Sequence, residues 1–555
     1  MELKRIFKIS AIVAAMALTG CGGDIEVTPT VNDSSVNNSN NTVNNNNGGD
    51  TTPVVENPCT SRTVAGTEIQ GDFQAPHCVY GTDFASKSLE IEENIEFSKL
   101  ENEGAHVFKG ALLIGKDCNT STGCSISSDG PTLKINAGTT LAFTSGESIV
   151  RIARGAKIDA IGTAEEPIRF TSAKEFAAFD IADTGAQFAD WGGIMVNGFG
   201  YTNECTNAER AATNCNSDSE GITSYYGGSN NEDSSGNIKY AHIWYAGSGP
   251  RDGGAGDDLN SLTLNAVGSG SSFEFLHIHQ GFDDGIEFFG GAASIKHIVV
   301  TDTQDDAVDV DAGWQGKGQF IVVKHGSIKT KSDVSYTNDD GVLVTIPAGT
   351  DGFMGNNGFE TDGEKNGGAE YSEAPASTLN FANVTVLTTD AKSIRDDSAS
   401  QGMKFDDAIR GKYYNALVVK TEGSNGTDCL EFKNSDKDEA ANAEADTLNF
   451  ENSVLACVSY FKNESETLPE GENKLDWFKN DGSNLVLDGA ADVLAADGFA
   501  TKSDSDAITI DANDLSSLND NFFTSVDFIG GVSDKDTSSE WYKWVKKAID
   551  ASNAD

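Results

Sequence analysis

The feature that most constrains the fold is an internal repeat of 22 residues in the middle of the chain. Residues 273–288 read FEFLHIHQGFDDGIEF and residues 295–310 read IKHIVVTDTQDDAVDV, so most apolar positions and the Asp pair recur 22 places later. The stretch 238–244 is an earlier copy of the first half, and 262–264 supplies its second half after an insertion. A unit of strand, corner and strand at this length is one coil of a solenoid, which buries its apolar face only by stacking on its neighbours.

Short strands extend this pattern toward the N-terminus. Residues 131–172 carry five apolar alternations of period 2, separated by corners that contain glycine and do not resemble hairpin turns. The chain lacks the Leu/Asn spacing of leucine-rich repeats and the blade signature of propellers. We therefore predict an all-β fold, a right-handed parallel β-helix over residues 58–450. Loops are expected as insertions at corners around 203–228, 248–258 and 348–375.

The last hundred residues follow a different pattern. We predict C-terminal strands and a capping helix over 451–555, with strands at 507–510 and 522–529. The run 537–540 (TSSE) is a capping-box pattern, and the helix after it would carry Trp541, Trp544 and Ile549 on one face. An amphipathic aromatic helix at the end of a solenoid is expected to cover its open strand edge.

The N-terminus has the pattern of a secretory signal peptide, residues 1–20. Three basic residues precede an apolar run, 9–18, that is too short to span a bilayer. The sequence LTGC, which ends at Cys21, resembles a bacterial lipoprotein processing box and implies a lipid anchor on Cys21; the alternative is ordinary cleavage without a lipid. No Asp follows Cys21 directly, which in lipoproteins implies sorting to the outer membrane. Residues 21–57 are rich in Asn, Ser and Thr, and we predict a disordered tether.

The remaining eight cysteines are even in number and contain no C-x-x-C motif. An oxidising compartment and short loops favour pairing between sequence neighbours. The predicted disulfides are Cys59/Cys78, Cys118/Cys124, Cys205/Cys215 and Cys429/Cys457.

The net charge of the chain limits the classes of binding partner that it can have. The formal net charge is −47, and it becomes −49 without residues 1–20, which hold three basic residues and one acidic residue. Such an excess argues against nucleic acid and against docking on anionic lipid, because both are polyanions. It favours divalent cations.

Several of the acidic residues come as Asp pairs, and the repeat places Asp283-Asp284 and Asp305-Asp306 on adjacent coils, about 4.8 Å apart. Like charges at that distance must either take up protons or be bridged by a cation, and calcium is the candidate cofactor. The alternative is that these carboxylates cap corners by accepting backbone N–H groups. These pairs include Asp283-Asp284, Asp305-Asp306, Asp339-Asp340, Asp396-Asp397 and Asp406-Asp407. The candidate metal ligands are Asp283, Asp284, Asp305, Asp306, Asp309 and Asp311.

A catalytic interpretation of the same residues is weaker. Clustered Asp can serve as general acid and base in polysaccharide hydrolases, and His325 lies nearby in sequence. The ordered coil spacing of such enzymes is absent, and a lyase would need a basic cluster that this chain lacks. His242, His277, His279 and His297 would share one strand face as a packed row, and Trp191 occupies a Gly-rich corner. We therefore predict no enzyme and no catalytic residues.

Several runs resemble bacterial β-helix surface lipoproteins. They include residues 153–172 (ARGAKIDAIGTAEEPIRFTS), 190–198 (DWGGIMVNG), 262–291, 305–320 and 522–536. Acidic forms of this kind are similar to S-layer proteins of marine Gammaproteobacteria of the Pseudoalteromonas type. The resemblance implies a structural protein on the outer face of the outer membrane that associates with itself, with surface polysaccharide as a further partner. The alternatives are a carbohydrate-binding or polysaccharide-degrading surface lipoprotein, and an adhesin.

Overall fold

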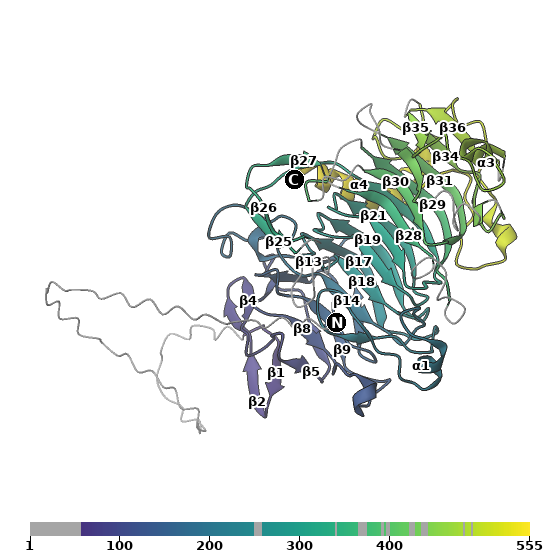
Figure 1. The fold of residues 1–555 in the computed structure, drawn as a ribbon. Helices are drawn as coiled ribbons and strands as arrows, with labels where there is room; N and C mark the ends of the chain where they lie inside the picture. The colour runs from purple at the N-terminus through teal and green to yellow at the C-terminus, as the bar shows by residue number, and fades with distance from the viewer. Residues whose placement is uncertain are drawn as a thin grey trace, which may run out of the picture. The chain divides into compact units, whose positions relative to one another are not determined.

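Two long parallel β-sheets wind around one apolar core, which confirms the predicted parallel β-helix (Figure 1). The computed structural model describes residues 57–555 apart from a few short gaps. The signal peptide, Cys21 and almost all of the tether therefore lie outside the described residues. The gaps are 249–257, 339–340, 354, 364–374, 390–392, 396–399, 421–427, 434–441, 444, 481–482 and 490–491.

The smaller sheet has eleven strands and forms one side of every coil. Its members are short, because each spans a single face between two corners. They are β5 (Glu90–Ile91), β8 (Leu112–Ile114), β11 (Val150–Ile152), β14 (Ile194–Asn197), β18 (Leu262–Asn265), β20 (Ile286–Phe289), β22 (Val308–Asp311), β28 (Asn357–Asp362), β30 (Gln401–Asp406), β32 (Asp428–Phe432) and β35 (Ser459–Phe461).

The larger sheet has seventeen strands and forms the other two sides. Its strands are β3 (Asp72–Gln74), β4 (His77–Tyr80), β6 (Ile95–Phe97), β7 (His106–Phe108), β9 (Thr132–Ile135), β10 (Thr140–Phe143), β12 (Lys157–Ile161), β13 (Ile168–Ser172), β17 (Gly236–Trp244), β19 (Ser272–His279), β21 (Ser294–Thr301), β23 (Gly318–Lys324), β29 (Thr378–Thr388), β31 (Arg410–Lys420), β33 (Leu448–Glu451), β34 (Val454–Cys457) and β36 (Leu485–Asp488). In the early coils, the two sides formed by this sheet have separate strands, such as β12 and β13. From β17 to β31, one long strand spans both of these sides.

The strand register follows the repeat. Ile295 pairs with Phe273, and Val308 pairs with Ile286, each across 22 residues of chain. The earlier copy also aligns as predicted, with Ile238 opposite Phe273. The coils continue beyond residue 450 to β36, so the predicted boundary between the β-helix and the C-terminal region was too early. The sequence there is less regular, because a helix interrupts the last coil.

Each long strand bends at one residue other than glycine that has a positive φ. These residues are Tyr240, Phe275, His297, Phe320, Asn383 and Asn415. Asn tolerates this left-handed conformation, whereas Tyr, Phe and His are strained in it. Stacking of the four rings offsets the strain, with centroids 4.4 Å apart from Tyr240 to Phe275, 4.2 Å from Phe275 to His297 and 5.1 Å from His297 to Phe320.

The C-terminal helix α4 (Glu540–Ala554) has the apolar face that the sequence predicts, but its position differs from the prediction. It lies against β19 and β21 in the middle of the solenoid, where Trp544 stacks on His242, and not over the terminal strand edge. There the aromatic rings at the strand bends form a second apolar cluster together with α4 and the segment before it. Its N-cap is Ser539, not Thr537. The terminal coil is closed instead by α3 (Lys474–Asn480), whose Trp477 packs on Phe432 and Phe461.

The segment between β36 and α4 is largely irregular. No strand forms at 507–510 or at 522–529, where strands were predicted. Asparagine side chains of the coils hold this backbone in place: Asn415 donates to the carbonyl of Asn513 at 3.2 Å, and Asn383 donates to that of Phe528 at 3.2 Å. Apolar side chains of the segment pack on the bend residues without a strand ladder.

The remaining elements lie in the segments that connect the strands of the coils. They are the helix α1 (Asn207–Ala211), the hairpins β1 (Ser61–Val64) with β2 (Thr67–Gln70), β15 (Ser217–Asp218) with β16 (Tyr225–Tyr226), β24 (Ser327–Lys329) with β27 (Asp351–Phe353) and β25 (Val334–Thr337) with β26 (Leu343–Ile346), and the 3-10 turns Thr120–Thr122, Ala173–Glu175, Leu515–Leu518 and Asp534–Asp536.

All four predicted disulfides are present: Cys59–Cys78, Cys118–Cys124, Cys205–Cys215 and Cys429–Cys457. Each closes a short loop or joins neighbouring coils, as expected of a chain that folds in an oxidising compartment. Among the described residues, no helix is long and apolar enough to cross a membrane.

Candidate functional site

Acidic residues line the corner that leads into the smaller sheet. The N–H of Asp284 donates to Asn260 Oδ1 at 3.1 Å, the N–H of Asp306 donates to Asp284 Oδ1 at 2.9 Å, and the N–H of Asn357 donates to Asp306 Oδ1 at 2.7 Å. Each of these side chains thus accepts a hydrogen bond from a backbone N–H group of the next coil. Asp284 and Asp306 therefore fill the corner-capping role that the sequence left open beside metal binding.

Immediately after this corner, a row of charged side chains crosses the smaller sheet. Glu287, Asp309, Glu360, Lys404 and Glu431 occupy the same register position on β20, β22, β28, β30 and β32. Adjacent strands lie about 4.8 Å apart, so Glu287, Asp309 and Glu360 each face like charge on a neighbouring strand, whereas Lys404 lies between Glu360 and Glu431. Such a row needs protons or cations to be stable.

Three groups of carboxylates come close enough to share a cation, with ligand atoms within 4.8 Å of one another. The members of each group come from neighbouring coils, which is why sequence-distant residues meet. The first group is Asp283, Asp284 and Asp305; the second is Asp284, Glu287 and Asp309; the third is Glu360, Asp362 and Asp406.

The first group already holds an organic cation. The guanidinium of Arg395, only 7% exposed, forms ion pairs with Asp283 and, at 3.3 Å, with Asp305. Its other terminal nitrogen lies 2.6 Å from Asp258. Because Arg395 supplies the positive charge here, the group has less need of a metal ion.

The third group is paired with lysines. Lys404 binds Glu360, and Lys433 binds Asp406. Burial alone would lower the pKa of Lys404, but Glu360 and Asp306 outweigh it and the pKa of Lys404 is raised. The lysine is thereby held in its charged form, which suits charge compensation and not general-base chemistry.

The second group has no such partner. Among the described residues, no Lys, Arg or His forms an ion pair with Asp284, Glu287 or Asp309. Burial, followed by neighbouring carboxylates, raises the pKa of all three well above the ordinary range. Asp309 Oδ1 is buried and accepts no hydrogen bond. Within the described part of the chain, this group therefore has no ion pair like those of the other two, and only the more distant charge of Lys404 acts on Asp309.

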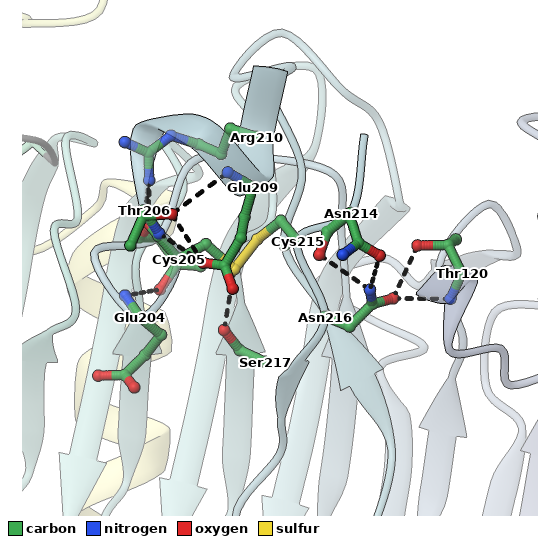
Figure 2. The surroundings of a disulfide bond; sticks show 12 residues. Thr120, Glu204, Cys205, Thr206, Glu209, Arg210, Asn214, Cys215, Asn216 and Ser217 are labelled. Atoms are coloured by element: carbon green, nitrogen blue, oxygen red, sulfur yellow. Dashed lines mark hydrogen bonds between the residues drawn. A yellow bond between two sulfur atoms is a disulfide. The ribbon is translucent and has the colours of Figure 1, made fainter. Parts of the chain in front are cut away.

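Further oxygen atoms surround the second group. The side-chain amide of Asn260 donates to Glu287 and, at 3.2 Å, to Glu220, while Thr263 lies one strand before Glu287 in the same row. Glu220 comes from the inserted loop 203–228, in which a disulfide joins Cys205 to Cys215 (Figure 2). Calcium takes six to eight hard oxygen ligands in irregular geometry, so this donor set fits calcium.

The candidate ligands named from the sequence fall into two sets. Asp283, Asp284, Asp305 and Asp309 belong to the groups above, whereas Asp306 and Asp311 do not. The carboxylate of Asp306 accepts the backbone N–H of Asn357, and that of Asp311 accepts the N–H of Ala312. Asp339-Asp340 and Asp396-Asp397 lie outside the described residues.

Sequence reasoning missed Glu287, Glu360, Asp362 and Arg395. Glu287 could have been found, because the 22-residue offset places it opposite Asp309. Glu360 and Asp362 follow a long insertion that hides their register with β22. Arg395 lies outside the 22-residue repeat, so the periodicity of the sequence does not indicate which residues it pairs with.

The histidines and Trp191 are structural. His242 and His277 share a register position, as predicted, and lie under α4 with His279, while His297 stacks on Phe275. The ring of Trp191 is buried against Phe143 and its Nε1 donates to the carbonyl of Trp244 at 2.8 Å. His325 is buried too and bonds to Ser400 at 3.1 Å. No histidine belongs to a candidate metal group within the described part of the chain.

Comparison with known proteins supports the architecture. Neither a search of curated proteins nor a search of solved structures found a significant match. Residues 111–490, more than half of the chain, match the family model described as pectate-lyase like beta helix domain. The matched span begins within the early coils and ends just after β36. The chain therefore belongs to the pectate-lyase-like β-helix domain family.

Proposed function

We propose that this protein is a structural component of the bacterial cell surface, an S-layer subunit or surface-coating lipoprotein stabilised by divalent cations. The observation that carries the proposal is the uncompensated group of Asp284, Glu287 and Asp309. A cation there would relieve repulsion between coils, and it would make the integrity of the coat depend on calcium.

Two further features support a place outside the cell. Four disulfides are typical of proteins that fold in an oxidising compartment. The predicted acylation of Cys21 would supply an outer-membrane lipid anchor, and residues 21–57 would hold the β-helix away from the membrane. A strongly acidic surface would repel other copies unless cations screened it, so self-association is expected to require calcium.

The test is to treat cells with a chelator and image their surface by electron microscopy. We expect the regular surface to dissolve and the protein to appear in the supernatant, with reassembly when calcium is restored but not when sodium alone is added. A lattice that survives chelation with no protein released would contradict the role of the cation. A scattered distribution on untreated cells would contradict the lattice itself.

A second candidate function is binding or cleavage of polysaccharide, which the family match favours. The arrangement of charges argues against cleavage at the acidic row: Arg395 is tied to three aspartates, and Lys404 is held protonated by its neighbours. Incubation with polygalacturonate and a broad glycan panel, followed by product analysis, separates the two candidates. Turnover that disappears in Lys404→Met would favour the enzyme.

A further inference from the structure

A pocket of about 970 Å³ lies where the segment between β36 and α4 crosses the bend residues His297 and Phe320. Its floor is apolar and buried. The floor residues and their exposed fractions are Phe320 at 6%, Ile529 at 3%, Val532 at 2% and Trp541 at 9%. A pocket of this size and lining is large enough to hold several side chains of a ligand.

Two walls of the pocket, 508–512 and 525–528, overlap the stretches for which the sequence predicts strands. In both walls apolar side chains alternate with polar ones, which is the pattern of a half-buried strand. The alternating apolar residues, all half-buried and all lining the pocket, are Ile508, Ile510, Ala512, Val526 and Phe528. Neither wall belongs to a sheet. The pattern of a strand is therefore present twice here without a strand partner.

The backbone in the middle of each wall is open. Thr509 and Ile510 in the first wall form no hydrogen bond through their backbone with any residue that the structure describes, and the same holds for Ser525 and Val526 in the second. Open backbone beside alternating apolar side chains is what an added strand pairs with when it docks on a sheet edge.

Hydrogen bonds from side chains nevertheless hold the ends of both walls. The bonds are those of the Ile508 N–H to Ser505 Oγ at 3.3 Å, Asn452 Nδ2 to the Asp511 carbonyl at 3.0 Å, the Thr524 N–H to Gln319 Oε1 at 2.8 Å and Asn383 Nδ2 to the Phe528 carbonyl at 3.2 Å. Walls that are fixed at their ends lose less conformational freedom when a ligand binds between them.

The rim of the pocket is acidic, with four aspartates against two lysines. Both lysines are already paired, Lys535 with Asp527 and Lys502 with an aspartate outside the pocket. The other three aspartates form no ion pair within the described part of the chain, while the more distant charge of Lys543 acts on Asp536. These three are Asp511, Asp514 and Asp536. An apolar floor under an acidic rim is complementary to a ligand that is both apolar and positively charged.

We propose that this pocket binds an extended cationic peptide, with apolar side chains at alternate positions on the floor and lysine or arginine side chains between them at the rim. Successive side chains of a strand point to opposite faces, so one peptide can meet both surfaces. Its backbone would pair with the two walls and complete a small sheet. The pocket is separate from the calcium group and from any lattice contact, so this proposal and the proposed function can fail separately.

The test is titration calorimetry of the mature protein in about 150 mM salt, which screens long-range attraction to the acidic surface. The probe is the peptide Lys-Ile-Lys-Val-Lys-Phe-Lys, blocked at both ends. We expect it to bind at least ten-fold more tightly than the same residues in the order Lys-Lys-Lys-Lys-Ile-Val-Phe, and than Glu-Ile-Glu-Val-Glu-Phe-Glu. Equal binding of the reordered peptide, or of the acidic one, would overturn the proposal.

Hydrogen exchange tests the pairing of the backbone. Bound peptide should slow amide exchange at least ten-fold at 509–511 and at 525–527. A peptide that carries N-methyl groups on its Ile, Val and Phe amides keeps the side chains but loses these donors, and it should bind at least ten-fold more weakly. Binding without slower exchange in the two walls would contradict the added strand.

Variants locate the binding. Ile510→Asp should weaken binding of the cationic peptide at least ten-fold, although it makes the rim more acidic. Ile161→Asp is the matched control, because Ile161 is 41% exposed at the end of β12 and does not line the pocket. It should leave the affinity unchanged. Unchanged affinity in a folded Ile510→Asp protein would show that the peptide binds elsewhere.

A second pair of variants keeps the test open if Ile510→Asp does not fold. Asp511 and Asp504 are both exposed, but only Asp511 lines the pocket. Asp511→Lys should weaken binding of the cationic peptide at least five-fold, whereas Asp504→Lys should change it less than two-fold. Equal effects of the two lysine substitutions would mean that net charge alone attracts the peptide, and would overturn the site.

Discussion

Arg395 and Asp258 form an ion pair of 2.6 Å in which the two side chains are 7% and 2% exposed. The same guanidinium binds Asp283 and Asp305, so one cation is shared by carboxylates from three separate segments. This pairing divides the acidic corner into a part that is compensated within the chain and a part that is not.

The first prediction concerns removal of that cation. Arg395→Met should lower the free energy of unfolding by about 3–5 kcal/mol, because it leaves buried carboxylates without a partner. Lys99→Met, which breaks the exposed pair with Glu166, should cost less than about 1 kcal/mol. Urea titrations of both variants in chelator test this. Equal losses would show that burial of the Arg395 pair contributes nothing.

The second prediction concerns pH and calcium together. Asp284, Glu287 and Asp309 have folded pKa values raised by burial. A raised pKa stabilises the fold below the ordinary carboxyl pKa and loses that contribution as pH rises through the folded value. Without calcium, this contribution should therefore fall as the solution becomes neutral.

Calcium should restore what is lost, because it replaces the protons. At 100 times its dissociation constant the expected gain is about 2.7 kcal/mol near pH 8, shrinking toward zero near pH 4. Paired thermal melts with calcium and with chelator across this range measure the difference directly. A calcium effect that grows in acid would contradict binding by these carboxylates.

The third prediction identifies the ligands. Glu287→Gln should remove most of the calcium-dependent rise in melting temperature, because it deletes one of three carboxylates of the second group. Glu431→Gln is the matched control: it occupies the same row on β32, but Glu431 is already paired with Lys462 at 2.6 Å. Calcium should stabilise that variant as it stabilises the unmodified protein. The same response in both variants would exclude the second group.

The fourth prediction concerns the contact between α4 and the histidines. Burial lowers the pKa of His242 and His277 well below 6.5, with Lys547, Arg169 and His279 adding to the effect on His242. A lowered histidine pKa gives stability above pH 6.5 that is lost as pH falls toward the folded value. We therefore expect α4 to loosen in acid.

Hydrogen exchange over Glu540–Ala554 measures this loosening. After correction for the pH dependence of intrinsic exchange, protection should drop at least ten-fold between pH 7.5 and pH 5. His242→Phe keeps a ring against Trp544 but cannot take up a proton, so its α4 should lose less protection. Identical profiles for the two proteins would rule out His242 as the group responsible.

Much of the fold could be predicted from the sequence, because the 22-residue repeat has the same length as one coil of the middle part. The 22-residue offset fixed the register of β19 to β21 and of β20 to β22, and the neighbour disulfides followed from loop length. The irregular C-terminal segment escaped prediction, since its apolar side chains pack on the coils from an irregular backbone that side-chain amides help to hold. Periodicity therefore predicted the coils and not what covers them.

The candidate site was predictable only in part, for a related reason. Asp284 and Asp309 belong to the repeat, but whether a carboxylate caps a corner or faces its neighbours depends on rotamers that sequence does not encode. Arg395, which compensates the first group, is more than eighty residues along the chain from Asp283 and Asp305, the two repeat aspartates that it binds. Charge pairing across such a distance leaves no local pattern.

The position of α4 has a consequence for when the protein can finish folding. Tyr240 contacts Glu540 across 300 residues of chain, and Tyr245 bonds to Asp555 at 2.7 Å across 310. The aromatic side of the middle coils therefore stays exposed to solvent until α4 packs on it. If the chain crosses a membrane N-terminus first, as the proposed function implies, we expect the middle coils to remain incomplete until Glu540–Ala554 has emerged.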